Sequence, residues 1–289
     1  MRITVIGTFN IDCVGTSSYP LHQGESHPGK IKISAGGVAR NIVENLARLG
    51  LDISFITAVG FDANGVMFKK ELEDLGVKFI MPENSKKHLT STYLAINNGE
   101  GQLEYAVVET SILAEICPLF LKKHLDEINQ SDVVLIDTNL TEEAIEYLFE
   151  NVRVPIAADA VSEIKANKLK KYLDRLTLLK VNKHEMEVLA KDLEEKHPDN
   201  LIITSGKDDL IYIKKDDDSN YVTKKYSPLP AFRIVNTTGA GDALLAGIIY
   251  GMVKEHDLEK GITLGLKMSQ LTLEVHEAVN REVKRLLNK

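Results

Sequence analysis

Residues 236–242 read Asn236-Thr237-Thr238-Gly239-Ala240-Gly241-Asp242, between an extended run at 232–235 and a small apolar run at 243–249. This order predicts a strand or loop that leads directly into a buried helix. A helix begins with four unbonded backbone N–H groups and a partial positive charge, and glycines let a phosphate approach them without meeting a Cβ atom. The carboxylate of Asp242 fits such a site if it accepts the proton of a hydroxyl that attacks phosphorus. Alternatively, Asp242 is an ordinary helix N-cap.

The composition indicates a globular protein with a substantial core. The chain has 289 residues, of which 44% are hydrophobic and 27% charged, and a formal net charge of -7. This charge offers no basic surface to a nucleic acid. Cys13 and Cys117 are too few for a disulfide framework, so we expect reduced thiols and a cytoplasmic protein. We expect neither a membrane span, which needs ~18 apolar residues, nor a signal peptide, because a strand is predicted from residue 3.

Strand and helix signals alternate along most of the chain. The predicted strands are 3–7, 53–59, 133–137, 154–159, 177–181 and 201–206, and the predicted helices are 38–49, 66–75, 141–151, 162–172, 183–191, 239–253 and segments of 258–287. Repeated β-α units predict a three-layer α/β/α fold with a mostly parallel sheet. We expect residues 1–289 to form a single domain. A late hairpin is predicted from 210–213 and 221–226, with 216–218 as its solvated turn rather than a calcium site.

Three further segments predict a small β-strand lid. Residues 31–34 alternate like a short exposed strand, and residues 91–96 and 102–108 flank a turn typical of a hairpin. We place the lid at about residues 12–34 and 90–109, over the carboxyl ends of the main strands. There it would exclude water from a phosphoryl transfer. The alternative is a peripheral hairpin without a function.

Polar residues follow several of the predicted strands, at the edge of the sheet where open parallel sheets bind ligands. Asn10 and Asp12 follow the first strand, so they are candidates for contacts with substrate hydroxyls or, alternatively, caps of a loop. Asn182 and Glu185 stand three residues apart at the start of a helix and can face one point. This pair could order the waters of a Mg²⁺ ion near a phosphate, or it could simply form a capping box.

A second glycine pair, Gly36-Gly37, precedes an amphipathic helix, which carries Asn41 in its early turns. Together with residues 238–242, this run resembles the two motifs of the ribokinase-like family of carbohydrate and nucleoside kinases. The resemblance covers essentially the whole chain and implies the family's α/β/α fold. Within the family, residues 36–50 are most similar to pseudouridine kinases, as are residues 137–140 and 158–162 more loosely.

The resemblance implies roles for the residues of the two motifs. Asp242 matches the catalytic base, and Gly239, Ala240 and Gly241 match the anion hole for the transferring phosphoryl group. The sugar hydroxyls are held by residues that match Asp12, Gly36, Gly37 and Asn41, to which we add Asn10. Thr92, with Ser91, is our candidate for the contact with the nucleoside base.

The resemblance also implies how ATP and its metal bind. Asn182 and Glu185 match an Asn-x-x-Glu element that acts on Mg²⁺ and phosphate, with Glu185 reaching the metal through water. The nucleotide contacts are matched by Thr204, Ser205, Gly206 and Thr238. Two departures matter: Asn236 replaces an acidic residue, which leaves activation by K⁺ open, and Asp209 replaces a glycine of the nucleotide turn.

The function implied is an ATP-dependent kinase that phosphorylates the 5′-hydroxyl of pseudouridine, with ATP and Mg²⁺ as cofactors. The partners are then a nucleoside and ATP, without nucleic acid or membrane, and a homodimer through the lid is compatible with this reading. The alternatives are a kinase of a free sugar or of a purine nucleoside, and a catalytically silent nucleoside-binding regulator.

Overall fold

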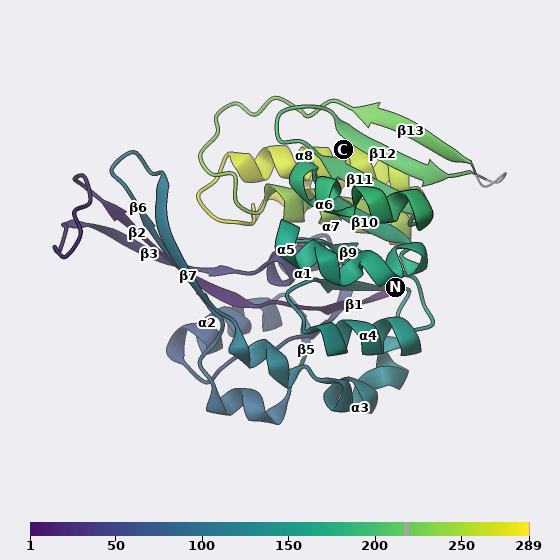
Figure 1. Ribbon diagram of the computed structural model, residues 1–289, viewed down its shortest axis with the longest axis horizontal. Helices are drawn as coiled ribbons and strands as arrows, with labels where there is room; N and C mark the ends of the chain where they lie inside the picture. Colours follow the sequence, from purple (N-terminus) through teal and green to yellow (C-terminus); the bar gives the residue numbers. More distant parts are fainter. Residues whose placement is uncertain (217–219, 289) are drawn as a thin grey trace.

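A nine-stranded sheet forms the centre of the protein (Figure 1). The structure is a computed structural model that describes residues 1–216 and 220–288, so residues 217 and 218 of the predicted hairpin turn lie outside it. Along the sheet the strands are β13 (Tyr221–Tyr226), β12 (Leu210–Lys215), β11 (Asn200–Thr204), β10 (Leu178–Asn182), β9 (Ile156–Asp159), β8 (Val133–Asp137), β1 (Arg2–Ile6), β4 (Asp52–Ile56) and β5 (Lys78–Ile80). The strands from β11 to β5 run parallel, and β12 and β13 form an antiparallel edge.

Helices cover both faces of this sheet, because successive strand residues point to opposite faces. On β1, for example, Ile3 and Val5 pack into one apolar cluster and Ile6 packs into the other. The first face is covered by α1 (Val38–Arg48), α2 (Ala63–Glu73), α7 (Ala240–Tyr250) and α8 (Leu258–Leu273). The second face is covered by α3 (Pro118–Ile128), α4 (Glu142–Asn151), α5 (Glu163–Ala166) and α6 (Lys183–Glu195). The predicted three-layer fold is therefore confirmed, although the sequence patterns did not predict α3 or β5.

Short irregular helices connect these elements. They are η1 (Glu83–Lys87), η2 (Ser111–Glu115), η3 (Asn167–Arg175), the π-helix η4 (Gly251–Glu255) and η5 (Val283–Asn288). The extended run predicted at 232–235 is a loop, which leads into α7. Within the described residues, no helix combines the length and the apolar character needed to cross a membrane.

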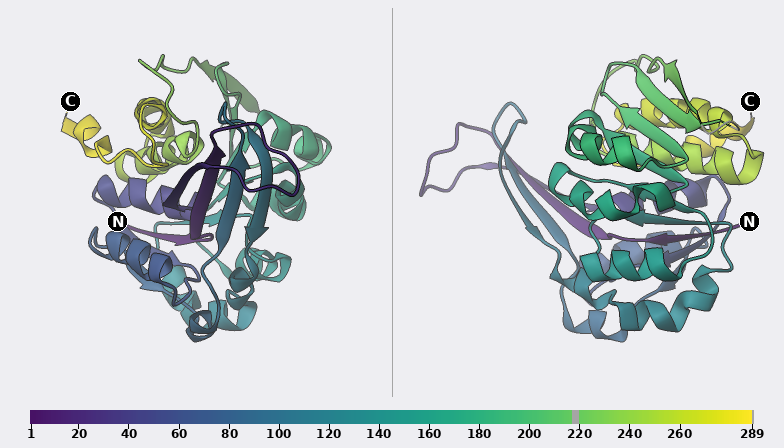
Figure 2. Two further views of the ribbon diagram at one scale, coloured as in Figure 1. Left: turned by 90° about the vertical axis from the view of Figure 1, so that its left-hand side faces the viewer. Right: turned by 45° about the vertical axis from the view of Figure 1, so that its right-hand side comes forward.

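A second sheet of four strands projects away from the α/β body and forms the lid (Figures 1 and 2). Its order is β3 (Gly29–Gly36), β2 (Asn10–Ser17), β6 (Thr92–Asn97) and β7 (Leu103–Glu109). The predicted lid is thus confirmed, but within its segment 12–34 the sequence patterns identified only residues 31–34 as a strand and missed β2. In β2 only Ile11, Cys13 and Val14 are apolar, and they do not alternate strictly with polar residues, so the usual signal of a half-buried strand is weak.

The lid begins at the point where the strand order of the main sheet reverses. The chain passes from β1 to β4 and β5 on one side and returns to β8 on the other. Asp137, the last residue of β8, links the neighbouring segments at this point. Its Oδ2 accepts hydrogen bonds from Thr8 N (2.8 Å), Thr8 Oγ1 (2.7 Å) and Ala39 N (3.2 Å). Ligands of open α/β sheets bind in the crevice at such a switch point.

Candidate active site

The N-terminus of α7 is open to a ligand. Its N-cap, Gly239, has the left-handed φ of 82°, and no side chain in the described part of the chain caps the helix. A Cβ atom at Gly239 would lie 1.9 Å from the carbonyl oxygen of Ala278, so only glycine fits. Ala240 N makes only a long bond of 3.4 Å to Thr237 O, and the backbone N–H groups of Gly241 and Asp242 have no acceptor among the described residues, so the start of α7 can receive an anion.

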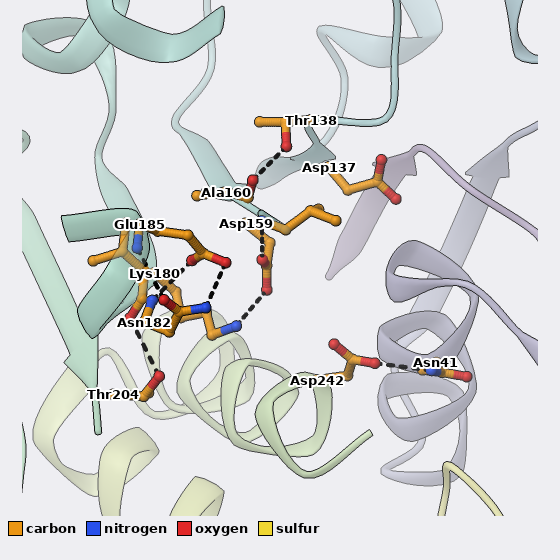
Figure 3. A network of polar contacts seen from close by, with 12 residues as sticks. Asn41, Asp137, Thr138, Asp159, Ala160, Lys180, Asn182, Glu185, Thr204 and Asp242 are labelled. Carbon is orange, nitrogen blue, oxygen red and sulfur yellow. Dashed lines mark hydrogen bonds and ion pairs between the residues drawn. The ribbon is translucent and has the colours of Figure 1, made fainter. Parts of the chain in front are cut away.

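Asp242 lies in the first turn of α7 and points toward α1 (Figure 3). Its side chain is buried, and its Oδ2 accepts a hydrogen bond of 2.8 Å from Asn41 Nδ2. Burial raises the pKa of Asp242 to about 7, helped by the charges of Asp159 and Asp137 and opposed by Lys180 and by the Asn41 hydrogen bond. A carboxyl group with this pKa can accept a proton near neutral pH.

The predicted sugar contacts gather at the start of α1 and at the base of the lid. A Cβ atom at Gly36 would lie 2.1 Å from Asp12 Oδ2, so this carboxylate rests directly against the backbone of Gly36. Gly37, the N-cap of α1, has a φ of 98°, and a Cβ atom there would lie 2.7 Å from Thr8 O. Asn10 pairs with Gly36 in the lid sheet, and its buried Oδ1 has no hydrogen-bond partner among the described residues.

Asp12 is the second carboxyl group of the site with a raised pKa. Burial raises the pKa of Asp12 to about 6, and the positive charge of Arg40 acts in the opposite direction. Within the described chain no donor reaches its carboxylate. Its oxygens are therefore available to hydroxyl groups of a ligand, as is the Oδ1 of Asn10.

The register of the lid separates the two residues proposed for the base contact. Asp12 pairs with Ser34 on β3 and with Tyr93 on β6, whereas Thr92 pairs with Ile11. Paired residues share a face and successive residues alternate, so Thr92 lies on the face opposite Asp12, where its Oγ1 donates to Thr90 O. The structure thus brings Tyr93 to the Asp12 face in place of Thr92. Ser91, one residue before β6, stays compatible with the prediction because its buried Oγ has no partner among the described residues.

The N-terminus of α6 is closed by its own side chains. Asn182 Oδ1 accepts from Glu185 N (2.9 Å), and Glu185 accepts from Asn182 N (2.8 Å) and from Asn182 Nδ2 (2.7 Å). The alternative reading of this pair, a capping box, is therefore present. Glu185 is also almost fully buried, which raises the pKa of its carboxyl group, and the charge of Lys180 acts in the opposite direction.

A cavity of about 600 Å³ lies beside the N-terminus of α7. It brings together Thr204, Ser205 and Gly206, the predicted nucleotide turn, with Ala240 and Gly241. Its other walls are mainly apolar and include Leu210, Leu229, Pro230, Ile234, Leu244 and Leu266. The shape and composition suit a nucleotide whose base is held by apolar contacts while its phosphates point at α7.

The predicted contact Thr238 lies outside this cavity wall, and so does Asp209, which replaces a glycine of the nucleotide turn. The backbone N–H of Thr238 donates to Asn236 Oδ1 (3.0 Å), while Asn236 Nδ2 donates to His276 O (3.2 Å). The carboxylate of Asp209 accepts from Ser227 Oγ (2.8 Å) and so belongs to the hairpin rather than to the cavity.

Lys180 on β10 is a residue of this site that the sequence patterns did not identify. Its Nζ forms an ion pair of 3.0 Å with Asp159 Oδ2 and lies 3.2 Å from the position of a Cβ atom on Gly241 (Figure 3). Burial alone would lower the pKa of its ammonium group, but Asp159, Asp242 and Glu185 hold it above the ordinary value. A fixed positive charge therefore lies directly behind the start of α7. The signal in the sequence was a single lysine inside an otherwise apolar strand.

The described residues contain no group of three or more His, Cys, Asp or Glu side chains arranged to hold a metal ion. A Mg²⁺ ion in a kinase site usually keeps several waters and takes one or two carboxylates and the substrate phosphates as ligands. Glu185 fits this requirement, because a carboxylate has about four lone-pair sites and only two hydrogen bonds reach it here.

The chain resembles known proteins along nearly its whole length. A family model described as pfkB family carbohydrate kinase matches residues 1–284. The chain is 35% identical over 261 residues to an uncharacterized sugar kinase of Escherichia coli K12, YeiI, covering 86% of this chain and 72% of that protein. It is 32% identical over 265 residues to the pseudouridine kinase of the same organism, covering 85% and 82%. A ribokinase structure from Thermotoga maritima has a TM-score of 0.83 at 18% identity, covering 100% of each chain.

Proposed function

Because the chain belongs to the pfkB family of carbohydrate kinases, we propose that it phosphorylates the 5′-hydroxyl of pseudouridine with ATP. One observation supports this most strongly. Asp242 lies at an uncapped helix N-terminus, between the nucleotide cavity and the group formed by Asn10, Asp12 and Asn41. A base in this position can accept the proton of a hydroxyl bound on one side while that hydroxyl attacks a phosphate bound on the other.

The residues of the chain account for the elementary steps. Asp12, Asn10 and Asn41 hold the ribose hydroxyls and direct the 5′-oxygen toward the γ-phosphorus of ATP. Asp242 takes the proton of this hydroxyl as the new O–P bond forms and the bond to the bridging oxygen breaks, so that ADP leaves with the electron pair. The N–H groups at the start of α7 and the ammonium of Lys180 stabilise the charge on the transferring group.

Mg²⁺ belongs to the proposal as the ion that neutralises the ATP phosphates. Glu185 would hold it through water from the start of α6. Thr204, Ser205 and Gly206 would contact the nucleotide, with Thr238 nearby on the loop before α7. K⁺ is not part of the proposal: Asn236 carries no charge, its oxygen accepts from Thr238 N, and its nitrogen donates to His276 O.

The choice of pseudouridine depends on the base contact. Pseudouridine carries one ring N–H more than uridine, and a site that accepts a hydrogen bond from it leaves a buried acceptor unpaired when uridine binds. The buried Oγ of Ser91 offers such an acceptor, and Tyr93 lies on the same face of the lid as Asp12. A free sugar is the second candidate substrate, because the relative at 35% identity is named a sugar kinase.

The outer face of the lid supports a homodimer. Ile31, Ile33, Leu94, Ile96, Tyr105 and Val107 are all exposed, and the register places them on the face opposite Asp12. Six exposed, mainly apolar side chains on one face are typical of an interaction surface. A second copy of the lid would cover it symmetrically, and light scattering of the wild-type protein and of Ile33→Glu would show whether a dimer is lost.

The function is tested by ADP release from ATP and Mg²⁺ with pseudouridine, uridine, inosine, ribose and fructose. We expect pseudouridine to give a kcat/KM more than ~200-fold above uridine, beyond the ~10–200-fold discrimination that a missing methylene allows. Equal values for the two pyrimidine nucleosides would remove the pseudouridine assignment and leave a nucleoside kinase. Turnover of ribose or fructose alone would make the protein a sugar kinase.

A further inference from the structure

Arg40 is a buried cation that none of the proposed steps uses. Only 4% of the residue is exposed, and its backbone N–H donates to Thr8 O at 3.1 Å. Its Nη2 forms an ion pair of 2.5 Å with Glu44 Oε2 one turn along α1. Its Nε has no hydrogen-bond partner among the described residues. Neutralising Glu44 does not by itself require Arg40, because Arg48 contacts the same carboxylate at 2.6 Å.

The other end of the guanidinium group reaches the catalytic base through one residue. Arg40 Nη1 donates to Asn41 Oδ1 at 3.2 Å, and Asn41 Nδ2 donates to Asp242 Oδ2 at 2.8 Å. An asparagine amide has one oxygen that accepts and one nitrogen that donates. Because Arg40 can only donate, it fixes the amide oxygen of Asn41 on its own side and leaves the amide nitrogen to face Asp242.

The same guanidinium group acts on the carboxylate that is proposed to hold the ribose. The sheet partners of Asp12, Ser34 and Tyr93, carry no positive charge, whereas Arg40 lines a small pocket together with Ser34. Burial favours its neutral form, and the charge of Arg40 favours its ionised form. Only the ionised form accepts hydrogen bonds from two hydroxyl groups with both oxygens.

We propose that Arg40 is a positioning residue that connects the two carboxylates of the site: it directs the Asn41 amide to Asp242 and keeps Asp12 ready for the ribose hydroxyls. This inference rests on the proposed function for its kinetic consequences, but the contacts themselves do not depend on the substrate. Arg40 makes no contact with the nucleotide cavity, whose lining residues come from other elements. Its removal should therefore affect the nucleoside and not ATP.

The test uses Arg40→Met, and the double variant Arg40→Met/Glu44→Gln, which avoids leaving a buried glutamate with one partner fewer. Arg48→Met is the matched control, because Arg48 contacts Glu44 and neither Asn41 nor Asp12. In both Arg40 variants we expect kcat/KM for the nucleoside to fall by about 10–100-fold, the scale of a misplaced reactive group. The acid limb of its pH profile should move to higher pH, and KM for ATP should stay within about twofold of wild type.

A second measurement does not require turnover. Carbon-13 NMR of the aspartate carboxyl groups, assigned with Asp12→Asn, should show a higher pKa for Asp12 in Arg40→Met than in wild type or Arg48→Met. An unchanged Asp12 pKa, together with a kinetic loss no larger than that of Arg48→Met, would reduce Arg40 to a structural ion-pair partner. A protein that turns over no nucleoside, yet shows the shifted pKa, would refute the proposed function and leave the Arg40 coupling standing.

Discussion

Helices α7 and α6 both begin at the edge of the sheet where the site lies, but their first backbone N–H groups are satisfied in different ways. At α6, Asn182 and Glu185 form a complete capping box, with bonds of 2.9 and 2.8 Å. At α7, the N-cap is Gly239 and no side chain in the described residues caps the helix. Instead, the buried Asp242 lies in its first turn with a pKa raised to about 7.

This difference indicates that the start of α6 contributes mainly to folding stability and the start of α7 mainly to function. A capped N-terminus is satisfied without a ligand, so its residues contribute to folding whatever the protein binds. The start of α7 lacks a cap and holds a buried carboxyl group, both of which cost folding stability. That arrangement is understandable if α7 receives the phosphoryl group during catalysis. Substitutions at the two helices should therefore have effects of different kinds.

The largest effect is expected from Asp242→Asn. The amide keeps the shape of the side chain but cannot accept the proton, and general-base contributions are typically ~10²–10⁴-fold. We expect kcat to fall by that factor while the affinity for ATP, measured by calorimetry, stays close to wild type. A loss of less than about tenfold in kcat would remove Asp242 from the role of base.

The same substitution should stabilise the protein above neutral pH. The pKa of Asp242 is about 7 in the folded protein and 3.8 as an ordinary carboxyl group, so the folded state favours its protonated form. Its contribution to stability is complete below about pH 4 and is lost as the pH rises through 7. At pH 8, Asp242→Asn should exceed wild type by on the order of 2–4 kcal/mol in the free energy of unfolding.

Denaturant unfolding at pH 4.5 and at pH 8 measures this difference, which should shrink to about 1 kcal/mol at the lower pH, close to the ordinary pKa of 3.8. An advantage of the same size at both pH values would mean that the gain comes from packing or hydrogen bonding and not from the buried charge.

Smaller effects are expected at α6. Asn182→Ala removes the cap and should lower the free energy of unfolding by about 0.5–2 kcal/mol.

Glu185→Gln keeps an acceptor for Asn182 N but loses the charge, so the Mg²⁺ concentration needed for half-maximal activity should rise. If Glu185→Gln alters stability alone and leaves the Mg²⁺ dependence unchanged, the pair is only a cap.

The sequence predicted the helix starts better than it predicted the lid. Glycines followed by apolar residues mark α1 and α7 locally, so Gly37, Gly239 and Asp242 could be identified without knowing any long-range contact. The strand β2 could not, because it has few apolar residues and pairs in parallel with β6, about 80 residues later in the chain (Ile11 with Thr92).

Two residues of the site required the three-dimensional register. A shift of one residue in strand pairing exchanges the faces of a sheet, so the sequence could not distinguish Thr92 from Tyr93 as neighbours of Asp12. Lys180 has no motif of its own, and its importance appears only when β10 places its ammonium group behind Gly241. For the same reason, Arg40 reads in the sequence as one polar residue of an amphipathic helix.

The most direct test of the account is the pH dependence of kcat/KM for the nucleoside between pH 5 and pH 8.5, with ATP and Mg²⁺ saturating. Both carboxyl groups must be ionised, and burial raises their pKa values to about 7 for Asp242 and about 6 for Asp12. The account predicts a plateau above pH 7, a fall with unit slope just below it and a steeper fall below pH 6. A kcat/KM that stays constant down to pH 5 would contradict the assignment of Asp242 as the base.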